Sequence, residues 1–169
     1  GSGYEVSVEV DSLDLRKTTA LLAVTGVPFF GELDADMNFT IDGKTGAPSS
    51  GYIKLSGTQL TIGPATVRTD KFPPLTFFEI PQSNFGSLDI DMQVEEQKPR
   101  GSKLVIENFT TRGRDIRTEA WGDVELSTRF ERHRPGVELR LQFDEGFVKK
   151  NSLAPLLNVK QFRRGQNKD

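Results

Sequence analysis

Two Asp-x-Asp pairs are the residues best placed to do chemistry in this sequence. Asp34 and Asp36 form the first pair, and Asp89 and Asp91 form the second. Two carboxylates on one strand face can bind Ca²⁺ or act as a general acid and base. Neither pair has the glycine and long loop of a calcium site, and acidic residues on a solvated face also discourage edge pairing. We therefore interpret both pairs as solvent-facing and predict no metal site.

The single histidine, His133, is the other residue type that could support catalysis. It lies in a predicted turn beside Arg132, Arg134 and Pro135, where a lone histidine is far more often a solvated loop residue than a catalyst. The chain has no cysteine, so nucleophilic triads and zinc sites have few possible members. The sequence predicts a protein that is not an enzyme and has no catalytic residue, metal or cofactor.

Several arginines cluster in the second half of the chain. Arg112, Arg114 and Arg117 could contact phosphates or lipid head groups. Acidic residues are interleaved with them, which favours ordinary surface charge. The whole chain has 22 basic and 24 acidic residues, for a net charge of −2, so no overall positive field attracts nucleic acid. We predict no nucleic-acid partner.

A nine-residue segment that occurs almost twice indicates how the carboxylates are positioned. One copy begins at Gly31 and the other at Gly86, and the copies share Gly, Leu, both Asp and Met. Apolar and polar residues alternate in each copy, which predicts a strand with one apolar and one solvated face. The match favours a duplicated supersecondary unit. We expect Met37 and Met92 at equivalent positions in one apolar interior, with the four aspartates facing water.

The remainder of the chain continues this one-sided pattern. Its 169 residues include 16 Gly and 9 Pro, which suits one all-β domain of short strands. We predict a curved, repeat-built antiparallel sheet, a half-barrel or taco-like shape, with repeat units over about 1–70 and 71–143. The strands are expected at 4–10, 18–24, 32–41, 52–55, 59–62, 65–68, 75–80, 88–94, 103–109, 115–120, 123–129 and 137–143. The last two are expected to form a hairpin.

The pattern changes after residue 143. In 144–162 the apolar residues fall three or four apart, as on one side of a helix. Ser152 can cap a helix that has Pro155 in its first turn. The sequence predicts one or two short helices in this C-terminal segment.

The predicted strands together present a large apolar face that cannot remain in water. It could close into a barrel, fold over as a sandwich or half-barrel, or be covered by lipid or a partner protein. The residues predicted for this face are Leu33, Met37, Phe39, Leu88, Ile90, Met92, Leu139, Leu141 and Phe143.

The second half resembles a known family in the order of its elements. The order is a strand, a Gly-Arg-Asp turn, a strand ending in a Gly-Asp step, a strongly alternating strand, and a short Leu-rich helix before a basic tail. These elements are carried by 103–112, 113–115, 116–123, 137–143 and 147–169. In this order the chain resembles the periplasmic region of the bacterial type II secretion system protein N family. The first half matches only as generic short β repeats.

The resemblance implies a non-enzymatic component of the secretion machine. Such a protein would lie in the periplasm, contact other type II secretion subunits, and be held at the inner membrane by an anchor helix near its N-terminus. No apolar run of the roughly 18 residues that a membrane helix needs is present here. The family also resembles the AsmA-like proteins, whose one-sided sheets form grooves associated with lipids. Two functions therefore stay open, a structural or interaction subunit and a lipid-binding or lipid-conducting groove.

Overall fold

The all-β prediction is confirmed by a computed structural model, which describes residues 3–68, 77–97, 101–126 and 134–154. Most of the described residues lie in nine strands, and the helices are short. The strands are β1 Tyr4–Asp14, β2 Phe29–Ile41, β3 Pro48–Ile62, β4 Ala65–Arg68, β5 Phe77–Ile80, β6 Ser83–Gln97, β7 Gly101–Arg112, β8 Ile116–Leu126 and β9 Arg134–Phe143. The helices are the 3₁₀ turn η1 Leu15–Lys17, α1 Thr19–Thr25 and α2 Glu145–Lys150.

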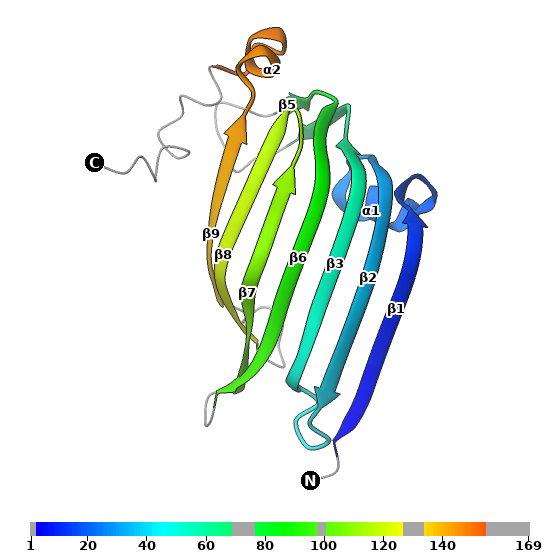
Figure 1. Ribbon diagram of the computed structural model, residues 1–169, viewed down its shortest axis with the longest axis vertical. Helices are drawn as coiled ribbons and strands as arrows, with labels where there is room; N and C mark the ends of the chain where they lie inside the picture. Colours follow the sequence, from blue (N-terminus) through cyan, green and yellow to red (C-terminus); the bar gives the residue numbers. More distant parts are fainter. Residues whose placement is uncertain (1–2, 69–76, 98–100, 127–133, 155–169) are drawn as a thin grey trace, which may run out of the picture.

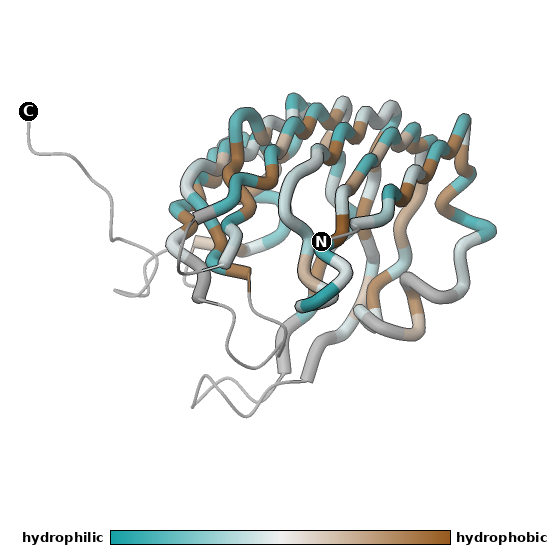
Figure 2. Tube along the Cα trace, turned by 90° about the horizontal axis from the view of Figure 1, so that it is seen from below, coloured by the Kyte–Doolittle hydropathy of each residue, from teal (hydrophilic) through white to brown (hydrophobic). Residues whose placement is uncertain are grey.

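Seven of the strands form one antiparallel sheet in the order β1-β2-β3-β6-β7-β8-β9 (Figure 1). The remaining two, β4 and β5, form a separate small hairpin between β3 and β6 in the chain. Figure 2 shows the large sheet bent into an open arch, with short elements and connections on its inner side. The curved, open antiparallel sheet expected from the sequence is therefore present.

Two predicted strand breaks are wrong. Gly57 was expected to separate two strands, yet β3 runs through it, with Gly57 opposite both Leu33 and Leu88. A Cβ on Gly57 would lie 3.1 Å from Leu60 Cδ1 and 3.3 Å from Leu88 Cβ, so the glycine allows close packing within the sheet. Gly122 likewise lies inside β8, at a φ of 123°, where a Cβ would meet the carbonyl oxygen of Gly136.

A helix also replaces one predicted strand. The apolar stretch 18–24 was expected among the strands, but Thr19–Thr25 forms α1. Gly26 ends this helix in the left-handed conformation, with a φ of 68°, and its N–H donates to the Leu22 carbonyl oxygen. A short apolar run has no periodicity that separates a strand from a buried helix, and here the C-terminal glycine favours the helix.

The C-terminal helical segment is confirmed in part. Asp144 caps α2, because its Oδ1 accepts a hydrogen bond of 2.9 Å from the Phe147 N–H. Phe147 is the buried residue of this helix. The second helix expected after Ser152 lies mostly outside the described residues. Among the described residues, no helix is long and apolar enough to cross a membrane.

Candidate functional site

The apolar face of the large sheet is the candidate site, and its side chains lie in rows across the strands. Met37 on β2 and Met92 on β6 both lie opposite Ile53 on β3. In the next row Ala35 and Ile90 both lie opposite Leu55. The two nine-residue segments therefore flank β3 in the same register, with their methionines at equivalent positions.

All nine residues predicted for the apolar face share one side of the sheet. Leu33 and Leu88 lie in the Gly57 row, and Phe39 lies opposite Gly51. At the other end of the sheet Leu139 lies opposite Ala120, Leu141 opposite Thr118 and Phe143 opposite Ile116. Successive side chains of a β-strand point to opposite faces of the sheet. The strict alternation of apolar and polar residues in the sequence therefore places the apolar residues on one face.

Several members of this face are not among the nine residues predicted for it. Val6, Val8 and Val137 belong to it through their pairing with Phe39, Met37 and Gly122. Their own alternation with polar residues was a sufficient signal. Thr111 and Thr118 also lie on this face, opposite each other and buried, and no local pattern marked them as inward-facing.

Burial on the apolar face falls sharply from the centre of the sheet to its edges. Ile90 and Val94 on the central strand β6 are 7% and 6% exposed. Val8 on the edge strand β1 is 40% exposed, and Leu139 on the edge strand β9 is 58% exposed. The described chain therefore covers the middle of this face and leaves an apolar strip in water along each edge, a feature that commonly marks an interaction surface.

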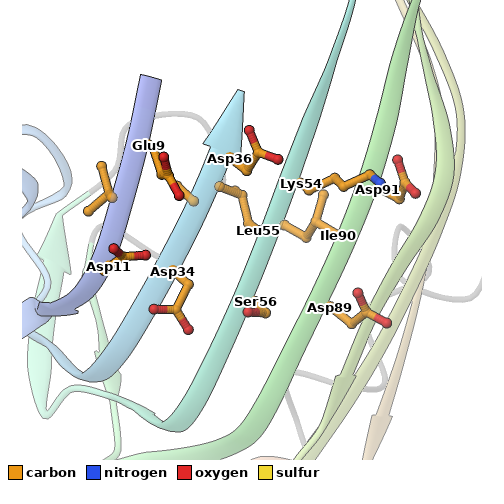
Figure 3. A pocket seen from close by; sticks show the side chains of 12 residues that line it. Glu9, Asp11, Asp34, Asp36, Lys54, Leu55, Ser56, Asp89, Ile90 and Asp91 are labelled. Atoms are coloured by element: carbon orange, nitrogen blue, oxygen red, sulfur yellow. The ribbon is translucent and has the colours of Figure 1, made fainter. Parts of the chain in front are cut away.

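The opposite face carries the Asp-x-Asp pairs around a hollow of about 340 Å³ (Figure 3). Asp36 and Asp91 both lie opposite Lys54, and Asp34 and Asp89 both lie opposite Ser56. Figure 3 shows the Lys54 side chain directed toward Asp91. The repeated segments thus place four carboxylates symmetrically about β3, where cross-strand pairing of opposite charges stabilises a sheet.

These carboxylates differ in their surroundings. Asp34, Asp36 and Asp89 are exposed, as expected, but Asp91 is half-buried and its Oδ1 is shielded without a hydrogen-bond partner. The Asp34 Oδ1 accepts a hydrogen bond of 2.7 Å from the Ser12 N–H. The Tyr52 hydroxyl donates to Asp36, and this hydrogen bond raises the pKa of Tyr52 above its ordinary value. Within the described ranges, no three His, Cys, Asp or Glu side chains are grouped to hold a metal ion.

The Gly-Arg-Asp turn is joined by hydrogen bonds to the start of β6 and to the start of α2. Asp115 Oδ2 accepts a 2.8 Å hydrogen bond from the Asn84 N–H, and Oδ1 accepts a 3.0 Å bond from Arg114 Nε. Burial raises the pKa of Asp115, but these two hydrogen bonds, together with the positive charges of Arg114 and Lys150, outweigh burial and lower it below its ordinary value. The Asp115 carbonyl oxygen accepts from the Asp144 N–H at the start of α2. His133, the other candidate from the sequence, lies outside the described residues.

Comparisons of this chain with protein-family models, with curated proteins and with solved structures found no match.

Proposed function

We propose that this protein is a non-enzymatic interaction subunit of a bacterial type II secretion system, acting in the periplasm beside the inner membrane. The observation that supports an interaction role is the apolar strip left exposed along the edge strand β9, at Leu139 and Leu141. The resemblance of residues 103–169 to the protein N family supports the choice of assembly. Membrane attachment would come from the anchor helix that the resemblance implies.

The two edges of the sheet are not equally open to a partner strand. On β1 the register shifts between Val10 and Leu13, and Ser12 has a φ of 50°. Such bulges protect edge strands from pairing. On β9 the register with β8 is continuous from Arg134 to Phe143. The outer edge of β9 is therefore the better template for an added strand.

Strand addition at β9 would give affinity and specificity by separate means. Main-chain hydrogen bonds along the outer edge of β9 would supply affinity, and alternate side chains would supply specificity. An added strand would also cover Leu139 and Leu141, which are 58% and 43% exposed. Burying a large apolar side chain stabilises by about 1.5–3 kcal/mol. The rigid arch would hold this edge in a fixed orientation for neighbouring subunits.

A lipid-binding or lipid-conducting groove is the second candidate. It is favoured by the exposed apolar residues at both rims of the apolar face, which are its two edge strands, with Val8 on β1 and Val137 and Leu139 on β9. Acyl chains lying against the apolar face would cover the exposed apolar residues of both rims. Strand addition at β9 would leave the β1 rim in water.

Site-specific photo-crosslinking in the native membrane tests the proposal. A crosslinking amino acid replaces Leu139 in the protein, and a matched variant carries it at Glu138, the next position on β9 but on the opposite face. We expect Leu139 to crosslink to a secretion subunit and Glu138 to do so several-fold less. A third variant at Val8 reports the other rim.

The pattern of crosslinks separates the two candidates. Secretion subunits captured from Leu139 and not from Val8 would support strand addition at β9. Lipid captured from both Leu139 and Val8, with no secretion subunit, would favour the groove. Equal capture from Leu139 and Glu138 would contradict both, because neither face would then be selective.

A further inference from the structure

A second hollow, of about 550 Å³, lies on the polar face of β7, β8 and β9, near the Gly113–Asp115 turn. This is the side of the sheet opposite the apolar face. Three arginines line the hollow, Arg112 from β7, Arg117 from β8 and Arg140 from β9. Neighbouring β-strands lie about 4.8 Å apart, so the three arginine side chains can reach the same space.

Arg112 and Arg117 form a like-charge pair that has no ion-pair partner among the described residues. They lie directly opposite each other in the β7–β8 register, and both are exposed. Within the part of the chain that the structure describes, neither guanidinium has a hydrogen bond or ion pair. Like charges directly across a sheet are destabilising. An arrangement of this kind is relieved when an anion binds between the two groups.

The other described arginines behave differently. Arg16, Arg114 and Arg140 each contact a carboxylate, at 3.0 Å from Asp14, 3.0 Å from Asp115 and 3.2 Å from Glu119. Arg140 also lies over the Trp121 ring, 5.5 Å from its centroid. Lone guanidinium groups are thus confined to the hollow among the arginine side chains that the structure describes.

We propose that this hollow binds a phosphate group. Two guanidinium forks, the Gln142 amide and the Thr110 hydroxyl all line it and can donate hydrogen bonds. A phosphate offers three or more acceptor oxygens and matches the planar fork of arginine, whereas a carboxylate offers only two oxygens. The Glu119 carboxylate in the same hollow is already paired with Arg140, so it does not neutralise Arg112 and Arg117. The phosphate could belong to a soluble phosphate ester or to a lipid head group.

Calorimetric titration and thermal unfolding of this chain at low salt test the proposal, because salt screens exposed charges. The probes are inorganic phosphate, and phosphatidylcholine vesicles with and without phosphatidic acid. We expect phosphate to bind and to raise the Tm, as any ligand specific for the folded state does. Binding of phosphatidic acid vesicles in addition would assign the site to a lipid head group. Binding of free phosphate alone would assign it to a soluble ester.

The double variant R112Q/R117Q should weaken phosphate binding about tenfold or more, since it removes both charge-assisted contacts. Its Tm without phosphate should equal or slightly exceed that of the parent, because the like-charge pair is gone. Lys17→Gln with Lys44→Gln makes the same change in net charge at exposed positions on the N-terminal half and should leave binding unchanged.

Two results would overturn the proposal. One is a parent protein that binds neither phosphate nor phosphatidic acid vesicles. The other is phosphate binding that survives in R112Q/R117Q. If that variant does not fold, Arg117→Lys keeps the charge but removes the fork, and unchanged affinity in it would count against the site. The hollow and the exposed apolar strip of β9 lie on opposite faces of the sheet. A failure to bind phosphate would therefore leave the proposed interaction role of β9 intact.

Discussion

The central strand β6 and the edge strand β9 carry the same alternation of apolar and polar residues but have different environments. Ile90 and Val94 of β6 are 7% and 6% exposed, whereas Leu139 and Leu141 of β9 are 58% and 43% exposed. Strand β6 has a hydrogen-bonded neighbour on each side, and β9 has one neighbour in the described sheet. The same sequence pattern therefore builds a core in one place and leaves an exposed apolar strip in the other, and strand order decides which.

A buried charge at the centre should have the largest effect on stability. Ile90→Asp should lower the free energy of unfolding by about 3–5 kcal/mol, because an unpaired carboxylate would be desolvated among apolar side chains. Urea denaturation measures this loss. The matched control is Asp89→Asn, at the next position on β6 and on the exposed face, which should change stability by less than about 0.5 kcal/mol. A small effect of Ile90→Asp would show that water already reaches the centre.

Loss of the Asp115 hydrogen bonds at the start of β6 should have the second-largest effect on stability. This effect depends on pH. Asp115→Asn should cost about 1–3 kcal/mol at pH 7, because the charged acceptor for the Asn84 N–H and for Arg114 Nε is lost. The pKa of Asp115 is lowered by folding. The stability that its ionised form adds is therefore present above the ordinary pKa of 3.8 and lost as the pH falls through the folded value.

Urea denaturation of the parent and of Asp115→Asn at pH 7 and at pH 3 tests this linkage. The difference between the two proteins should shrink at the lower pH. An equal difference at both values would mean that the carboxylate contributes by shape and packing rather than by charge. Asp123→Asn, also on β8, serves as the control and should show little change at either pH.

Much of the sheet could be predicted because strand parity is local. The alternation around Met37, Met92 and Leu139 was enough to place these residues on one face, and the structure puts them there. The breaks expected at Gly57 and Gly122 were wrong because a glycine in a strand and a glycine in a turn look alike in sequence. Only the partner strand distinguishes them, through Leu88 against Gly57 and Gly136 against Gly122.

Strand order and exposure could not be predicted from the local pattern. The β4–β5 hairpin separates β3 from β6 in the chain, yet β6 pairs with β3. The arginine cluster was visible in the sequence, but the direct opposition of Arg112 and Arg117 depends on the β7–β8 register. Likewise, nothing local distinguishes Ile90 from Leu139, although one is in the core and the other in water.

The smallest effect on stability is expected at the open edge. Leu139→Asp places a charge on the same face as Ile90→Asp, but at a side chain that is 58% exposed. The new carboxylate would stay hydrated, so we expect urea denaturation to show a loss below about 1 kcal/mol in the isolated protein. The adjacent variant Glu138→Gln, on the polar face of β9, should change stability by less than about 0.5 kcal/mol. A loss for Leu139→Asp close to that for Ile90→Asp would mean that other parts of the chain cover this edge in solution. A small loss, combined with reduced capture of a secretion subunit by a crosslinking amino acid at Leu141, would assign Leu139 to partner binding. The variant would then fold normally and fail only where a partner is needed.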